Sequence, residues 1–182
     1  RAKLQSYETV LVYGGTSGVG AAAIQISKEL GAQVIATAGN YDKCEYSKRI
    51  GANYVVNHSN DNWIDEVKKI TDNSGIDVVF EHIGSKTWKQ SQRLLSKGGR
   101  IVTCGATSGP DVNINLAHLF MKQQSIIGST MSNIQTFQEV ISKVNEKKYK
   151  PTVDKVFPME NIRDAHEYIE NREQMGKVVI VP

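Results

Sequence analysis

The chain lacks several features that would place it in a specialised class. It has two cysteines, Cys44 and Cys104, which are too few for a disulfide framework and fit a reducing cytoplasm. No apolar run approaches the roughly 20 residues of a membrane span, and no signal-peptide pattern opens the sequence. The 22 Lys and Arg residues nearly balance the 19 Asp and Glu residues, and no dominant basic patch indicates a nucleic-acid partner. We therefore expect a cytoplasmic protein that binds neither membranes nor nucleic acids.

The chain also lacks the spacings that mark a metal site. Its cysteines and histidines form no close pair of the C-x-x-C or H-x-x-x-H kind, so we expect no zinc site made by this chain alone. The adjacent Glu81 and His82 invite an acid/base interpretation. They lie at the end of an expected strand, however, and we assign them a structural role or one that acts on the site through neighbouring residues. No catalytic residue is assigned from the sequence.

What is present is an alternation of short β-branched runs with amphipathic helical stretches along residues 1–149. This pattern predicts an α/β fold with a parallel sheet covered by helices on both faces. The expected strands span residues 9–13, 33–37, 54–57, 77–81, 100–104 and 125–128. Six strands are typical of a complete doubly wound nucleotide-binding domain, the Rossmann fold. Residues 150–182 break the rhythm, and we expect them to form a separate C-terminal return segment.

The stretch VYGGTSGVG, residues 12–20, joins the first expected strand to the first expected helix. Glycine permits the backbone conformations of such a turn and lets a pyrophosphate approach the amide groups without obstruction. The helix N-terminus adds unpaired N–H donors and the positive end of the helix dipole. The sequence therefore predicts a pyrophosphate-binding turn, whose ligands we assign to Gly15, Thr16, Ser17, Gly18 and Val19.

This turn fits the glycine patterns of two dehydrogenase superfamilies. Counted back from Gly20 it is a dinucleotide fingerprint in which Ser17 replaces the middle glycine, and counted forward from Gly14 it is the G-x-x-x-G-x-G of short-chain dehydrogenases. Short-chain dehydrogenases also carry a catalytic Tyr-x-x-x-Lys and an Asn-Asn-Ala-Gly segment. No tyrosine here is followed by lysine four residues later, and FEHIGS stands where Asn-Asn-Ala-Gly would be expected. The short-chain alternative is therefore the weaker one.

The turn is followed, in the order typical of one family, by the stretches GANYVVNHS, GIDVVFEHIG, GGRIVTCGATSG, QSIIGST and GKVVIVP. Together they resemble the medium-chain dehydrogenase/reductase superfamily, in its zinc-type alcohol dehydrogenase-like and quinone oxidoreductase branches. The resemblance implies a cofactor domain that lacks the N-terminal GroES-like catalytic domain, cannot complete catalysis alone, and would have zinc only if that domain supplied it. The complete oxidoreductase would transfer hydride between nicotinamide and a small-molecule carbonyl, quinone or activated alkene. The alternative is a nucleotide-sensing module without turnover.

The second expected strand ends in ATAGNYDK, residues 36–43, without the Asp or Glu that usually accepts the ribose hydroxyls of NAD. This favours NADP, while Asp42 keeps NAD possible. In quinone oxidoreductases, by resemblance, Lys43 takes the place of a phosphate-binding lysine, and His58 stands where a tyrosine is common at the adenine end. We assign Thr37, Lys43 and His58 to this part of the cofactor site.

The nicotinamide is expected at the carboxyl ends of the last three strands of the sheet. By resemblance its ligands are small residues and backbone amides, with one basic residue near the C-terminus touching the cofactor. We assign this group to Gly84, Cys104, Gly105, Ala106, Ser129, Thr130 and Lys177. The resemblance also implies a homodimer paired through the edge strand, and the short apolar run at residues 125–130 would otherwise need covering.

Overall fold

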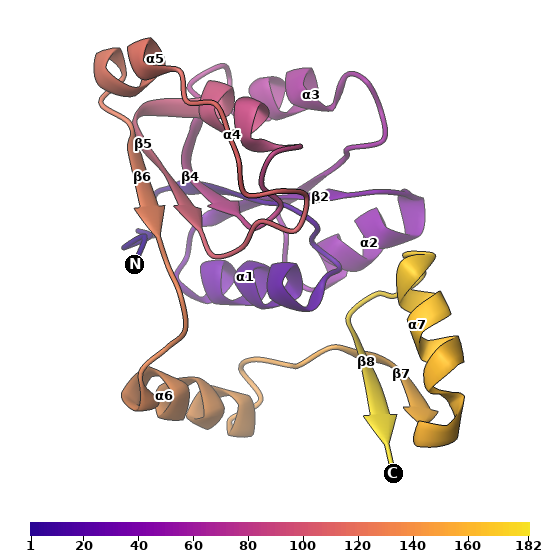
Figure 1. Ribbon diagram of the computed structural model, residues 1–182. Helices are drawn as coiled ribbons and strands as arrows, with labels where there is room; N and C mark the ends of the chain where they lie inside the picture. Colours follow the sequence, from indigo (N-terminus) through magenta and orange to yellow (C-terminus); the bar gives the residue numbers. More distant parts are fainter.

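Six parallel strands form the centre of the computed structural model, which describes residues 1–182 (Figure 1). Their order across the sheet is β3-β2-β1-β4-β5-β6, which confirms the doubly wound prediction. The strands are β1 (Thr9–Val12), β2 (Gln33–Ala38), β3 (Tyr54–Asn57), β4 (Ile76–Glu81), β5 (Leu95–Thr103) and β6 (Ser125–Gly128). The strand order reverses between β1 and β4, and a crevice for a ligand is expected there, at the carboxyl ends of the strands.

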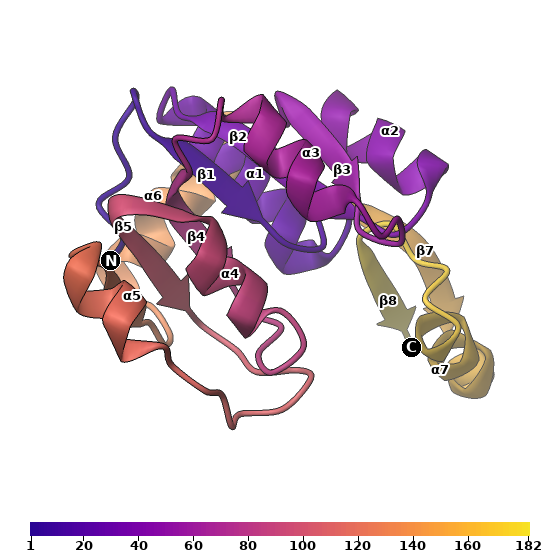
Figure 2. The same ribbon diagram turned by 90° about the horizontal axis from the view of Figure 1, so that it is seen from above.

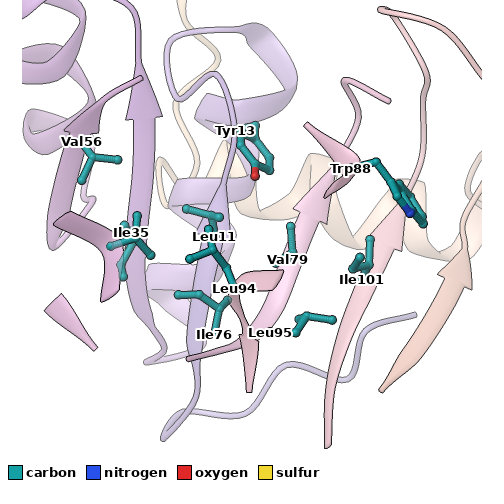
Figure 3. Close-up of a cluster of buried hydrophobic side chains, with 11 residues drawn as sticks. Leu11, Tyr13, Ile35, Val56, Ile76, Val79, Trp88, Leu94, Leu95 and Ile101 are labelled. Atoms are coloured by element: carbon teal, nitrogen blue, oxygen red, sulfur yellow. The ribbon is translucent and has the colours of Figure 1, made fainter. Parts of the chain in front are cut away.

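The central strands are apolar on both faces because helices cover both sides of the sheet. On β1, Val10 and Val12 belong to a buried cluster with Ile24 of the helix α1 (Gly18–Glu29), whereas Leu11 and the following Tyr13 belong to a second cluster with Trp88. Figure 3 shows the second cluster, in which the Tyr13 ring and the Trp88 indole lie among aliphatic side chains from several strands. The alternation of side chains along a strand thus supplies two cores from one sequence run.

Helices α1 and α2 lie on one face of the sheet, and α3 and α4 lie on the other (Figure 1). The helices of this unit are α1 (Gly18–Glu29), α2 (Tyr41–Arg49), α3 (Trp63–Ile70), α4 (Trp88–Leu94), α5 (Leu116–Met121) and α6 (Ile134–Asn145). Asparagine or serine caps four of them, as at Ser17 and Asn40, whose side chains accept hydrogen bonds from the first turn. No helix has the length and apolar character needed to cross a membrane.

The start of β5 differs from the sequence prediction. The strand was expected from residue 100, but pairing with β4 begins at Leu95 opposite Ile76 and shifts register before Arg100 pairs with Val78. The shift falls at the Lys-Gly-Gly segment, where a Cβ on Gly99 would lie only 2.8 Å from the carbonyl oxygen of Ile76. The absence of a side chain therefore lets the irregular segment stay against the sheet.

The C-terminal return segment forms a small unit of its own. It contains the parallel strands β7 (Val153–Pro158) and β8 (Lys177–Val181), joined by a short 3₁₀ turn η1 (Met159–Asn161) and α7 (Ile162–Glu170). Seen from above, this unit projects from the side of the molecule that carries α2 and β3 (Figure 2). It touches the large unit through a backbone bridge between Ser17 and Gly176 and a 2.7 Å contact between the hydroxyls of Tyr46 and Thr152.

Candidate functional site

The glycine turn sits at the switch point between β1 and β4. Gly14 has a φ of +58°, and its neighbour Gly15 donates its amide to the carbonyl of Thr37 at 2.8 Å, which anchors the turn to β2. Ser17 ends the turn as the N-cap of α1, where its hydroxyl accepts a hydrogen bond from the Gly20 amide at 2.9 Å. The chain thus leaves the sheet and enters the helix within a few residues.

The turn leaves donors free for an anion. The amides of Gly18 and Val19 have no hydrogen-bond partner in the chain, as expected at the first turn of a helix. A Cβ on Gly20 would overlap with the Gly14 carbonyl oxygen, so the close approach of turn and helix requires glycine. Free amides, a positive helix end and a backbone without side chains fit a pyrophosphate.

The five residues assigned to this part of the site therefore come together, but they do not contribute equally. The Thr16 residue is buried, and the Ser17 hydroxyl already accepts the capping hydrogen bond, although its proton remains free to be donated. Gly15 packs tightly, since a Cβ there would lie 2.7 Å from the Ser47 hydroxyl. The free amides of Gly18 and Val19 are the donors best placed for an anion.

The end of β2 carries a buried threonine, and beside it lie the histidine His58 and two positive side chains, those of Lys43 and Arg172. Thr37 is fully buried, and its hydroxyl lies 3.2 Å from both the Gly14 amide and Nδ1 of His58. The Thr37 hydroxyl therefore links the glycine turn to His58 by hydrogen bonds. Burial and then the nearby charges of Arg172 and Lys43 lower the pKa of His58. Burial is also the main cause that lowers the pKa of Lys43.

Arg172 is a site residue that the sequence analysis did not identify. The Lys43 ammonium donates a hydrogen bond to the backbone carbonyl of Arg172, which lies 129 residues further along the chain. Arg172 itself has a φ of +56° and follows α7, where no local pattern distinguishes it from a surface arginine. Only the packing of the return segment beside α2 brings Arg172, Lys43 and His58 together.

Lys177, which the sequence analysis grouped with the nicotinamide residues, lies instead over the N-terminus of α1 at the glycine turn. A parallel backbone bridge joins Gly176 to Ser17. The aliphatic part of the Lys177 side chain covers Gly18 so closely that a Cβ on Gly18 would overlap with this side chain. Residues 176 and 177 therefore lie against the first turn of α1, beside the amides that are free to bind an anion.

The loops after β4, β5 and β6 meet at the same end of the sheet. The register aligns Glu81 with Thr103 and Thr103 with Gly128, so the residues that follow these strands are neighbours. These residues include most of those assigned to the nicotinamide, namely Gly84, Cys104, Gly105, Ala106, Ser129 and Thr130. A Cβ on Gly84 would lie 3.2 Å from Cα of Ala106, which shows how closely the first two loops pack.

Neither Cys104 nor the Glu81–His82 pair has the geometry of a reacting group. Partial burial raises the pKa of the Cys104 thiol, and the Glu81 charge adds to this, so the thiolate is disfavoured. Glu81 is fully buried, and Nε2 of His82 lies 3.0 Å from the Tyr13 carbonyl oxygen, to which it can only donate. His82 thus connects the two sides of the switch point. No group of three or more His, Cys, Asp or Glu side chains is arranged to hold a metal ion.

Comparison with known proteins decides between the two glycine patterns. A family model described as zinc-binding dehydrogenase matches residues 18–146. The chain belongs to this family. It is a cofactor domain of the medium-chain dehydrogenase/reductase superfamily, which confirms the resemblance and sets the short-chain alternative aside.

Relatives in this family include oxidoreductases of several kinds. The chain is 33% identical over 187 residues to a quinone oxidoreductase of Rattus norvegicus, a match covering 99% of the chain and 56% of the relative. It is 32% identical to an NAD-dependent alcohol dehydrogenase of Sulfurisphaera tokodaii, with 100% and 53% covered. A thermostable alcohol dehydrogenase from Pyrobaculum aerophilum, solved with cobalt and zinc, superimposes with a TM-score of 0.88 at 34% identity, with 100% and 52% covered. The chain therefore spans about half the length of these zinc-binding dehydrogenase relatives.

Proposed function

We propose that this chain is the NADP(H)-binding domain of an oxidoreductase that reduces a carbonyl, a quinone or an activated alkene. The observation that carries the proposal is the pairing of free helix-terminal amides at Gly18 and Val19 with two positive side chains at the end of β2. The cofactor, when bound, supplies or accepts hydride at its nicotinamide ring. The chain's own residues bind and orient the cofactor.

The choice of NADP rests on the charges around the end of β2. The strand ends in small uncharged residues, and Lys43, His58 and Arg172 lie beside it. A 2′-phosphate placed here would meet the charges of Lys43 and Arg172, and Arg172 can bind two phosphate oxygens through its planar guanidinium group. The Asp154 carboxylate also acts on Lys43, but it already accepts hydrogen bonds from the Tyr168 hydroxyl and the Met175 amide. To bind the phosphate, the Lys43 ammonium would exchange its present partner, the carbonyl of Arg172, for the anion. Asp42 is exposed in the first turn of α2, and it is the residue that would favour NAD instead.

At the other end of the site, the residues after β5 are small and leave the backbone accessible to the nicotinamide. Gly105 and Ala106 place few side-chain atoms at the crevice, so amides and carbonyls there can orient a carboxamide, while the buried Gly84 lets the loop after β4 pack close behind them. We therefore keep the assignment of this region to the nicotinamide. The catalytic residues and any zinc ligands of the complete enzyme are proposed to lie in a separate catalytic domain.

The exposed apolar surface of this chain supports the proposal of such a domain. The two-stranded sheet of β7 and β8 is too small to be stable alone, and Val153, Val156 and Val181 on it are exposed. Helix α6 buries no residue, and its Ile134 and Phe137 side chains face solvent. A hollow of about 750 Å³ between α1 and the sheet is lined mainly by apolar side chains. We propose that residues 150–182 and α6 pack against the catalytic domain of the complete protein, and that residues 1–149 form the Rossmann unit.

We also propose a homodimer and a cytoplasmic location. Strand β6 is an unpaired edge of the sheet, and the neighbouring α5 exposes Leu116, Phe120 and Met121. A second copy pairing along residues 125–130 would satisfy the free backbone groups of the edge and cover this apolar surface. The free thiols of Cys44 and Cys104 suit a reducing compartment.

The test of the cofactor proposal is calorimetric titration of the protein with NADPH and NADH in parallel. We expect NADPH to bind at least about tenfold more tightly, a difference of about 1.4 kcal/mol in binding free energy. The Lys43→Ala and Arg172→Ala variants should lose most of this preference through weaker NADPH binding. Lys48→Ala is the matched control, because Lys48 lies on the same helix but pairs with Glu45 in solvent. Equal affinity of the wild type for NADH and NADPH would overturn the proposal.

The test of the hydride-transfer proposal uses the full-length protein. NADPH consumption is followed at 340 nm with a quinone, an enone and an aldehyde as separate acceptors, and we expect turnover with at least one class. Tight NADPH binding without oxidation by any of the three would instead support a nucleotide-sensing module.

A further inference from the structure

Glu81 is a buried carboxyl group surrounded by hydrogen-bond donors. It is the last residue of β4, is fully buried, and takes part in no salt bridge. Its Oε1 accepts hydrogen bonds from the amides of Ile83 and Gly84 at 2.7 and 3.1 Å. The hydroxyls of Thr87 and Ser91 donate to Oε2 at 2.9 and 2.7 Å. A buried charge is costly unless it is well hydrogen-bonded, so these donors must stay in place together.

The amides that donate to Glu81 belong to the loop between β4 and α4. This loop is in turn hydrogen-bonded to the loop that follows β5. Gly84 has a φ of +95°, which the hydrogen bond from its amide to Glu81 helps to fix. The following segment pairs with the loop after β5: the Ile83 carbonyl accepts from the Ser108 amide at 2.6 Å, and the Ser85 amide donates to the Gly109 carbonyl at 3.1 Å. Glu81 therefore holds the first loop directly, and the second loop is hydrogen-bonded to the first.

The same carboxyl group is linked to the glycine turn. The Ser91 hydroxyl lies 3.0 Å from the hydroxyl of Tyr13, a buried residue that directly precedes Gly14. Burial raises the pKa of Tyr13, and the charge of Glu81 adds to this, so the phenol stays protonated and able to hydrogen-bond. The hydrogen bonds from Tyr13 through Ser91 to Glu81 therefore connect the glycine turn to the loop after β4, within the protein interior.

We propose that Glu81 is a positioning residue for the nicotinamide half of the cofactor. Its Oε1 holds the Ile83 and Gly84 amides, and through them the loops after β4 and β5, in the shape that receives the ring. Glu81 does not touch the cofactor, and it acts as a hydrogen-bond acceptor rather than as a charge. This role rests on the proposed dinucleotide-binding function.

The experiment compares Glu81→Met, Glu81→Gln and the wild type by calorimetry with two probes, NADPH and adenosine 2′,5′-bisphosphate. The second probe occupies only the adenosine half of the site. Methionine keeps the length but removes both acceptors, so NADPH should bind at least about tenfold more weakly while the bisphosphate affinity stays within about twofold. Glutamine keeps one oxygen for the two amides, and its NADPH affinity should stay within about threefold of wild type. The fluorescence increase of bound NADPH should be reduced in the methionine variant alone.

The control is Glu8→Gln, which alters a half-buried carboxylate that pairs with Arg100 at the opposite end of the sheet. It should change thermal stability without changing the ratio of the two affinities. Unchanged NADPH binding in Glu81→Met, or equal loss of both ligands, would overturn the positioning role.

If Glu81→Met does not fold, hydrogen exchange of the wild type still tests the proposal. The Ile83 and Gly84 amides must then be protected before any ligand is added, and fast exchange at both would refute the inference. A wild type that binds neither probe would instead refute the proposed function.

Discussion

Replacement of Gly20 by alanine tests whether the turn and the helix are as close as the site requires. The Cβ of the new residue would overlap with the Gly14 carbonyl oxygen and lie 2.8 Å from its carbonyl carbon and 3.0 Å from the Ser17 hydroxyl. These neighbours are backbone atoms and the capping side chain, so none can rotate away freely. The contact with the carbonyl carbon alone would need a separation of about 0.7 Å to reach an ordinary carbon–carbon distance of about 3.5 Å, and the nearer carbonyl oxygen requires a larger one.

The expected loss of stability follows from two opposing effects. Alanine favours a helix over glycine by up to about 1 kcal/mol, whereas forcing an extra methyl group into a packed site costs about 1–3 kcal/mol. Because the overlap is with backbone, we expect the second effect to win and the melting temperature to fall by about 2–8 °C for a chain of this size. The displaced Gly18 and Val19 amides should also weaken NADPH binding at least about tenfold.

Differential scanning calorimetry and titration with NADPH measure the two effects. Lys48→Ala is again the control, since Lys48 lies on α2, pairs with Glu45 in solvent and should leave both the melting temperature and the NADPH affinity nearly unchanged. A Gly20→Ala protein that melts at the wild-type temperature and binds NADPH with wild-type affinity would refute the steric reasoning.

Three further predictions concern stability and assembly. Glu8→Gln should lower the free energy of unfolding at pH 7 by about 1–3 kcal/mol, because the carboxylate accepts charged hydrogen bonds from Arg100. Arg100 holds the pKa of Glu8 below its ordinary 4.5, so this contribution is fully present above 4.5, and urea titrations should show the difference fading as pH falls from that value through the lowered pKa. Ser17→Ala should cost about 1 kcal/mol through loss of the helix cap, measured by thermal unfolding. Ile127→Lys on the edge strand should convert the proposed dimer of the full-length protein into monomers in sedimentation velocity, and a wild type that sediments as a monomer would contradict the dimer.

The fold could be predicted from the sequence because its signals are local. Each strand of the large unit is a short β-branched run, and each following helix has an apolar face. The order of strands and helices can therefore be predicted from local sequence patterns. The early start of β5 at Leu95 could not be predicted in the same way. It depends on Ile76, a strand neighbour far along the chain, and on the backbone contact that Gly99 allows.

The candidate site was predictable where it is made by one continuous segment. The turn from Gly14 to Val19 carries its own glycines, its cap and its helix N-terminus, and these suffice to indicate an anion site. Arg172 was missed because its neighbour Lys43 is 129 residues away. Glu81 was recognised as structural, but the four groups that donate hydrogen bonds to it lie on a loop and a helix whose path the sequence does not specify.

The sequence by itself determined the α/β class, the strand and helix order and the glycine turn at the start of α1, because hydrophobic periodicity and glycine content act over short distances. The tertiary structure alone decided which distant groups share a surface. It placed Lys177 over the free amides of α1, Arg172 beside Lys43, and the Glu81 carboxylate under the loops after β4 and β5. These contacts arise from the crossover connections between parallel strands and from the packing of residues 150–182 beside α1 and α2. Both depend on the packing of the whole chain rather than on local preference.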